Sequence, residues 1–179
     1  MDLLYVYSNK RVEDQVETKA FLESISNNSN YNIYQYNTLE EYDYYNIVKT
    51  FWNRKKPFFI LEQDIVPTLD ILDEMRLCKE PFCAARYYIY PKSTALKEKV
   101  YAHRIITEYK NETDFKAKWV TDEDYADLYG LGLVKLTPFG NFFETPNSYR
   151  NLDFRISHHT YTHGFKAHLH GEVKHNHMW

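Results

Sequence analysis

The acidic pair Glu62 and Asp64 is the part of this sequence whose residue types and spacing are best suited to chemistry. The pair follows an apolar run over 58–61 that Pro57 precedes and Pro67 closes, a pattern typical of a buried strand. Because side chains alternate along an extended backbone, both carboxylates point to the same side. Removing two carboxylates from water is costly unless a cation or hydrogen-bond donors meet them. The pair therefore predicts a divalent-metal site that handles phosphates, and the alternative is the start of a solvated turn.

Histidines gather near the end of the chain. Seven of the eight follow residue 157, namely His158, His159, His163, His168, His170, His175 and His177. Their spacing is irregular, unlike that of an appended tag, and on an extended backbone His168 shares a face with His170, as His175 does with His177. Imidazole joined to carboxylates makes a mixed nitrogen and oxygen site, suited to Mn²⁺ as well as Mg²⁺. We expect at least one of these histidines to join Asp64 at a metal ion, whereas an individual histidine is more often a packed or surface residue.

The composition restricts the classes of protein to consider. The 179 residues suffice for a sizeable core, and we expect a single domain over 1–179. A net charge of -3 gives no broad attraction to nucleic acid. No apolar run approaches a membrane-spanning length and the N-terminus lacks a signal pattern, so a cytoplasmic location is expected. Cys78 and Cys83 are too few to define a disulfide framework and are interpreted as buried free thiols, with a local disulfide as the alternative.

The elements that must position these residues alternate in the first half of the chain. Apolar periodicity predicts strands over 3–7, 31–36, 57–66 and 82–90, and helices over 12–25, 39–52 and 69–78. In the second of these helices we expect Leu39, Tyr42, Val48 and Phe51 to face inward. Such alternation predicts an α/β fold, a single Rossmann-like domain with a mainly parallel central sheet flanked by helices.

The second half of the chain is less regular. Strands are expected over 100–107, 115–120 and 130–136, and a helix over 147–158 that contains Asp153. Gly130 and Gly132 open the last of these strands, where glycine permits close backbone approach. They are not a dinucleotide-binding fingerprint, because the third glycine and a suitably placed helix are missing.

In this order the motifs resemble those of the GT-A glycosyltransferases over most of the chain, and the small size and many tyrosines are similar to viral or archaeal members. Glu62-x-Asp64 matches the family's Asp-x-Asp, with glutamate in the first position. The resemblance implies that Asp64 binds Mn²⁺ or Mg²⁺ and that Glu62 holds the ribose or the metal. It also implies that a late histidine closes the metal site, a place that His175 fits best, with His170 and His177 as rivals.

The resemblance further implies a function, the transfer of a sugar from a nucleotide-sugar donor to an acceptor hydroxyl. Asp153 then matches the acid that serves as base toward the acceptor in inverting members. Its alternative role is that of a first-turn acid that complements a helix dipole. Tyr7, Ser8 and Asn9 lie where the first strand ends, the place where such folds hold the nucleobase.

Two other functions remain open at the level of sequence. A metal-dependent hydrolase would use the histidine cluster as a denser site, with several histidines converging on Asp64. A non-catalytic interaction protein would instead use faces rich in tyrosine, of which the chain has 17, to bind a partner.

Overall fold

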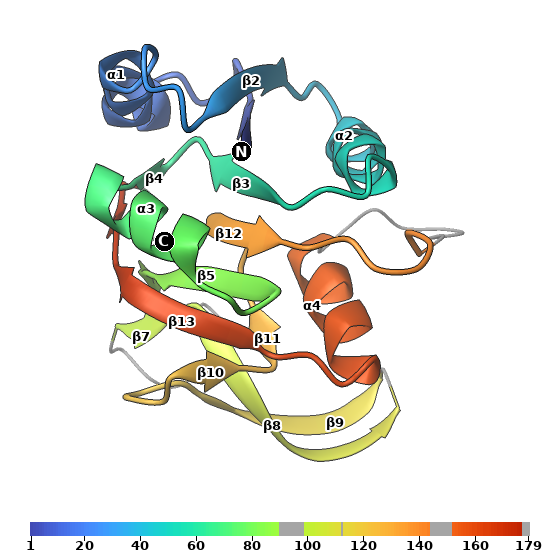
Figure 1. The fold of residues 1–179 in the computed structure, drawn as a ribbon. Coiled ribbons are helices and arrows are strands. Elements are labelled where there is room, and N and C mark those ends of the chain that lie inside the picture. Colours follow the sequence, from blue (N-terminus) through green and yellow to red (C-terminus); the bar gives the residue numbers. More distant parts are fainter. Residues whose placement is uncertain (90–98, 112, 144–151, 177–179) are drawn as a thin grey trace.

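The computed structural model describes residues 1–89, 99–111, 113–143 and 152–176. Its main element is a seven-stranded sheet (Figure 1). From one edge to the other its strands are β10 (Tyr125–Ala126), β13 (Ala167–Glu172), β5 (Phe82–Arg86), β12 (Leu133–Leu136), β3 (Phe58–Glu62), β1 (Asp2–Tyr7) and β2 (Asn32–Asn37).

The directions of the strands differ from those expected. β1 is parallel to β2 and β3, and β13 is parallel to β5, but β12 lies between β3 and β5 and is antiparallel to both. β10 is antiparallel to β13. Antiparallel pairing also forms three smaller sheets in the described residues. The first contains β11 (Leu128–Tyr129), β8 (His103–Asn111) and β9 (Asp114–Trp119). The second pairs β14 (Lys174–His175) with β4 (Ile65–Val66), and the third pairs β6 (Tyr88–Ile89) with β7 (Val100–Tyr101). The prediction of a mainly parallel, helix-flanked Rossmann sheet is therefore wrong, because the fold is a strand-rich mixed α/β with mostly antiparallel pairing.

The cause lies in the connections of the second half of the chain. The four α-helices of the described residues are α1 (Val16–Ser24), α2 (Glu41–Asn53), α3 (Leu69–Leu77) and α4 (Leu152–Thr162), and a 3₁₀ turn, Glu13–Gln15, precedes α1. No helix is described within 99–111 or 113–143, where strand follows strand. Parallel neighbours need a long crossover, usually a helix. β8 and β9 are joined directly and pair antiparallel, whereas β10 and β12 enter the central sheet from this stretch beside strands that are distant in the sequence. None of the helices so described is long and apolar enough to cross a lipid bilayer.

Apolar side chains from alternating strand positions fill both faces of the central sheet. On one face Ile60 of β3 belongs to a buried cluster with Trp52 of α2 and Ile156 of α4. On the other face Leu61 belongs to a cluster with Met75 of α3. β3 is buried on both faces, and at its carboxyl end the half-buried Glu62 is the first of its residues to reach solvent.

Candidate functional site

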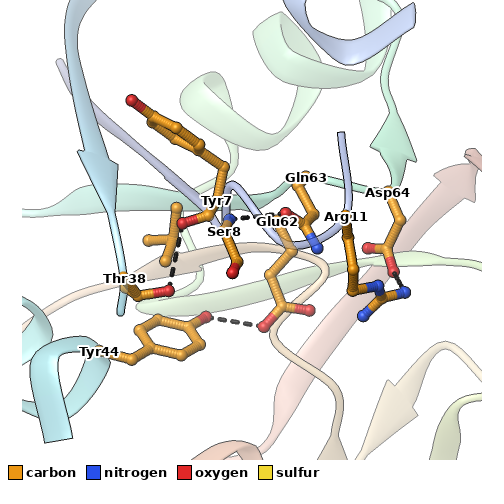
Figure 2. A pocket seen from close by; sticks show the side chains of 9 residues that line it. Tyr7, Ser8, Arg11, Thr38, Tyr44, Glu62, Gln63 and Asp64 are labelled. Atoms are coloured by element: carbon orange, nitrogen blue, oxygen red, sulfur yellow. Dashed lines mark hydrogen bonds and ion pairs between the residues drawn. The ribbon is translucent and has the colours of Figure 1, made fainter. Parts of the chain in front are cut away.

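A pocket of about 210 Å³ lies where the parallel strands β1 and β3 end (Figure 2). This edge of an α/β sheet is the usual place for a ligand. The residues that line the pocket are Val6, Tyr7, Ser8, Arg11, Thr38, Tyr44, Glu62, Gln63 and Asp64. Both members of the acidic pair are thus pocket residues.

Gln63, the residue between the two acids, links the loops that form the pocket. The side-chain oxygen of Gln63 accepts a hydrogen bond from the backbone N–H of Ser8 at 2.7 Å and lies 3.3 Å from Nε2 of Gln15. The hydroxyl of Thr18 in α1 lies 2.8 Å from the carbonyl oxygen of Gln63 and 2.9 Å from that of Ile65. The loops that follow β1 and β3 are therefore held together by buried polar contacts, which fixes the carboxylates on either side of Gln63.

A short ladder at the end of the described chain brings His175 to Asp64. β14 pairs antiparallel with β4 so that His175 lies opposite Ile65, and the N–H of Asn176 donates to the carbonyl of Asp64 at 2.7 Å. The imidazole Nε2 of His175 then lies 3.5 Å from Oδ2 of Asp64. Its Nδ1 lies 2.9 Å from the carbonyl oxygen of Tyr88, so Nδ1 carries a proton and Nε2 is the nitrogen that faces the carboxylate.

The electrostatics of this pair favour opposite charges. Burial opposes ionisation of Asp64, but the hydrogen bond and charge of His175, together with Arg11, outweigh it and lower the pKa of Asp64. Burial likewise opposes protonation of His175, but the hydrogen bonds to Asp64 and to the carbonyl of Tyr88 raise its pKa. Nη2 of Arg11 lies 3.3 Å from Oδ2 of Asp64, and its Nε lies 2.8 Å from Asp14. Asp64 is therefore a stable anion that a cation can bind in exchange for the proton of His175.

Glu62 has the opposite character. Its Oε1 accepts a hydrogen bond from the hydroxyl of Tyr44 in α2 at 2.8 Å, as Figure 2 shows. Burial, followed by the charges of Asp64 and Asp153, raises the pKa of Glu62 to about 8, although the bond from Tyr44 and the charge of His175 act against the rise. Glu62 is thus held largely protonated at neutral pH until a cation or a hydrogen-bond donor enters the pocket.

Asp153 stands in the first turn of α4, and its Oδ1 accepts a hydrogen bond from the N–H of Phe154 at 2.7 Å. It does not line the pocket, among the residues that the structure describes, and its side chain is exposed. Desolvation by the surrounding protein nevertheless raises its pKa, against the charge of Arg104. Its negative charge in turn raises the pKa of Glu62. Asp153 therefore belongs to the electrostatic surroundings of the pocket, and the helix start expected before it lies outside the described residues.

The three residues expected at the nucleobase differ in their positions. Ser8 and Tyr7 line the pocket, but the ring of Tyr7 points away from Glu62 in Figure 2 and stacks on Tyr5 at 5.3 Å between centroids. The carbonyl of Tyr7 accepts the N–H of Thr38 at 2.7 Å. Asn9 is exposed, outside the described lining of the pocket, and its N–H donates to the side chain of Asn37. From this segment it is thus Ser8 and the backbone of Tyr7 that reach the pocket.

Tyr87 supports His175 and explains the two glycines that open the segment before β12. A Cβ on Gly130 would lie 1.9 Å from the hydroxyl oxygen of Tyr87, and one on Gly132 would lie 2.8 Å from Cε1 of the same ring. The ring packs edge-on against His175 at 5.2 Å and against His103 at 5.6 Å. The glycines permit the close approach expected from the sequence, and what approaches is a tyrosine that buttresses the histidine.

The other described histidines lie elsewhere. His159 of α4 stacks on Phe139 at 5.0 Å, and His158 lies 2.9 Å from the hydroxyl of Tyr109. His170, a rival of His175 in the sequence, lies on β13 with its Nδ1 2.8 Å from a carboxylate oxygen of Glu74. The remaining rival, His177, lies outside the described residues. The dense histidine site that a hydrolase would need is not gathered at Asp64 within the described part of the chain.

Asp64 lines the pocket and His175 does not, among the described residues, but the two side chains together offer a cation one oxygen and one nitrogen ligand. Among the described residues, no third imidazole, thiol or carboxylate lies within 4.8 Å of both Asp64 and His175. A cation there would take its remaining ligands from water or from a bound substrate, a mixed set that suits Mn²⁺ or Mg²⁺. Sequence reasoning singled out Asp64 and His175, which the structure brings within 3.5 Å of each other. It did not find Arg11, Tyr44 or Tyr87, whose roles depend on how distant segments pack.

Comparison with known proteins gives a likeness of fold. No family model matches the chain, and no curated protein matches it. A solved crystal structure, that of A197 from STIV, is similar over 97% of this chain and 83% of that chain, with a TM-score of 0.50 and 14% sequence identity. At this identity the similarity extends to the fold and not to the chemistry of the pocket.

Proposed function

We propose that the chain is a metal-dependent glycosyltransferase that moves a sugar from a nucleotide-sugar donor to an acceptor hydroxyl. The observation that carries the proposal is the approach of Nε2 of His175 to Oδ2 of Asp64, at 3.5 Å, beside a pocket at the ends of β1 and β3. The two groups are far apart in the sequence, and a pairing of two short strands brings them together. The order of motifs that resembles the glycosyltransferases supports the same function.

The polar groups of the pocket suit a nucleoside diphosphate. Asp64 and His175 would hold Mn²⁺ or Mg²⁺, which supplies Lewis-acid stabilisation of the negative charge that develops on a departing diphosphate. Arg11 adds a guanidinium beside Asp64, with the fork of donors that matches phosphate oxygens. Glu62 and Tyr44 present a carboxyl and a hydroxyl that would bind the hydroxyls of the ribose. Ser8 and the backbone of the loop after β1 would meet the base.

Asp153 is the group we assign to the acceptor side. A general base works best when its pKa lies close to the working pH, and desolvation raises the pKa of Asp153 above its ordinary range. Its place outside the pocket lining fits an acceptor that enters next to the donor and gives its proton to this carboxylate. The reaction would then invert the anomeric carbon.

The competing functions have less support. A histidine-rich hydrolase would need several imidazoles at Asp64. Among the described histidines His175 lies beside Asp64, and the others lie on β8, in or just after α4, and on β13. A tyrosine-rich interaction surface would need exposed rings. Tyr42, Tyr109 and Tyr125 are exposed, but Tyr5, Tyr31 and Tyr45 are almost fully buried in the core.

Thermal shift of the purified chain with UDP-, GDP- and ADP-sugars, with and without Mn²⁺, tests the proposal. We expect at least one nucleotide sugar to raise the melting temperature only when Mn²⁺ is present, and Asp64→Asn to abolish this effect. Asp114→Asn, an exposed aspartate in β9 that pairs with Lys110, is the matched control and should leave the shift intact. A nucleotide shift that survives Asp64→Asn, or that needs no divalent ion, would contradict the proposal.

A further inference from the structure

A second cluster of potential metal ligands lies away from the pocket. One ligand atom from each of Cys78, Cys83 and His170 lies within 4.8 Å of the other two. Both cysteines are free thiols, Cys83 is buried, Cys78 is half-buried, and His170 is 4% exposed. Apolar sites rarely bring two thiols and an imidazole together without a reason, because each is a polar or reactive group that needs a partner.

Three elements converge to build this cluster. Cys78 directly follows α3, Cys83 is the second residue of β5, and His170 lies on β13, which runs parallel to β5. Lys135 of β12 pairs with Phe59 of β3 on one side and with Cys83 of β5 on the other, so Cys83 and Phe59 lie at the same height in the sheet. Glu62 lies three residues beyond Phe59 along β3. At about 3.3 Å per residue this places the cluster roughly 10 Å along the sheet from the pocket, on different strands.

His170 is oriented as a ligand. Its Nδ1 lies 2.8 Å from Oε1 of Glu74, so Nδ1–H donates to a carboxylate. This carboxylate–histidine contact is the usual support of an imidazole that binds a metal through its other nitrogen. That other nitrogen, Nε2, is buried and has no hydrogen-bond partner in the structure. A buried nitrogen without a partner costs free energy, and a metal ion in the cluster would remove this cost.

A fourth ligand and balancing charges lie beside the cluster. Nδ1 of His168, the neighbour of His170 on the same face of β13, lies 3.3 Å from Sγ of Cys78. Buried Lys135 donates from Nζ to the carbonyl of Cys78 at 2.7 Å. Two thiolates neutralise a divalent ion, and the charges of Lys135 and Glu74 offset each other.

We propose that Cys78, Cys83 and His170, with His168 as fourth ligand, form a structural zinc site. Two thiolates and two imidazoles in a tetrahedron are a typical zinc ligand set, whereas Mn²⁺ and Mg²⁺ prefer oxygen. With Zn–S bonds of about 2.3 Å, ligand atoms in a tetrahedron lie about 3.7 Å apart, so the ligand atoms of Cys78, Cys83 and His170, which lie within 4.8 Å of one another, need to approach by at most about 1 Å. The imidazole of His168 contacts Cys78 but lies outside this set, so it has to move further to complete the tetrahedron. The two thiols release their protons to solvent as the ion binds.

The site would fasten the end of α3 to β5 and β13. This matters for the pocket, because β13 leads directly into β14, which carries His175. Zinc at the cluster would therefore stabilise the strand that delivers the histidine, without taking part in the chemistry. Zinc binding at this cluster is independent of the glycosyl transfer proposed for the pocket.

Metal analysis and cobalt substitution of the full chain test the site. We expect about one zinc ion per chain after purification under reducing conditions, and Co²⁺ in its place should give tetrahedral d–d bands with a sulfur-to-cobalt charge-transfer band. Cys83→Ser and His170→Gln should each abolish the bound zinc and the tetrahedral cobalt spectrum. Glu74→Gln should weaken zinc binding about 10–100-fold. Asp64→Asn, which alters the pocket, is the control that should leave the spectrum unchanged.

Wild-type measurements alone can overturn the proposal, so a variant that fails to fold does not protect it. A chain that binds no zinc in reducing buffer, a cobalt spectrum without the thiolate band, or a Cys78–Cys83 disulfide as the resting state would each do so. A thiolate band that survives in His168→Asn but is lost in His170→Gln would retain the site and assign its fourth ligand to water.

Discussion

Glu62 should make the metal-free protein less stable as the pH rises. Its pKa is raised to about 8 from 4.5, so the folded chain holds a proton that the unfolded chain has released. At 1.36 kcal/mol per pKa unit, a shift of about 3.5 units corresponds to an upper limit of about 5 kcal/mol. This contribution is fully present below pH 4.5 and is lost as the pH rises through 8.

Replacing Glu62 by glutamine removes the titration but keeps an acceptor for the hydroxyl of Tyr44, which now bonds Oε1 at 2.8 Å. At pH 8.5, in the presence of a chelator, we expect Glu62→Gln to be more stable than the wild type by about 2–4 kcal/mol, or a melting temperature higher by about 5–15 °C. At pH 4.5 the two proteins should be equally stable.

Urea unfolding at both pH values measures this difference. Glu108→Gln is the matched control, because Glu108 is an exposed residue of β8 paired with Lys116, and it should change stability little at either pH. A Glu62→Gln variant that is destabilised at pH 8.5, or whose effect is the same at both pH values, would refute the assignment of a half-buried, protonated carboxyl.

Three further predictions concern other parts of the molecule. Burial lowers the pKa of His103 to about 4, so its neutral form contributes stability that is lost as the pH falls from 6.5 through 4, and His103→Gln should flatten this part of the stability–pH curve in urea unfolding. Gly132→Ala, whose Cβ would lie 2.9 Å from Ile65, should cost about 1–3 kcal/mol in chemical unfolding, whereas Gly171→Ala, with its nearest contact at 3.3 Å, should cost less; equal costs would contradict the close approach. His175→Gln should abolish Mn²⁺-dependent nucleotide binding in calorimetry, and the exposed His163→Gln should preserve it; loss in both variants would point to general damage.

Local patterns predicted the elements that place the acids. The apolar run before Glu62 is β3, and the helix expected over 69–78 is α3 (Leu69–Leu77). Both are short, strongly patterned segments with clear ends: Pro57 precedes the strand, and the hydroxyl of Thr68 accepts the N–H of Ile71 at the helix start. Both acids line the pocket, but Asp64 lies in a turn between β3 and β4 and not on the continuous strand expected over 57–66, so the alternation of side chains along a strand does not account for its position.

The sequence did not predict correctly which face of α2 is buried. Leu39 and Tyr42, expected to face inward, are 66% and 44% exposed, whereas Val48 and Phe51 are buried as expected. Leu39 lies before α2, which begins at Glu41, so the expected start of the helix was also too early. The buried face is set by contacts with β3 and α4 rather than by the start of the apolar pattern. Tyr44, which reaches Glu62, could not be distinguished from the other tyrosines of this helix for the same reason.

The direction of β12 depends on contacts that are distant in the sequence. Its residues read as a buried strand in either direction, and its place between β3 and β5 follows from how the chain returns after the β8–β9 hairpin. A local pattern carries no information on that path, so the sheet was expected to be mainly parallel. The histidines were dispersed for a related reason, since neighbours in sequence occupy α4, β13 and β14.

The contact between β14 and β4 has a dynamic consequence. Within the described residues, which end at 176, this ladder consists of two residue pairs, at Lys174 and His175, and its release would therefore break few of the described hydrogen bonds and need not disturb the central sheet. Release would carry the imidazole away from Asp64 and dismantle the two-ligand set in one movement. If Asp64 and His175 hold a cation as proposed, binding of the ion and docking of β14 on β4 are one coupled equilibrium, in which each stabilises the other.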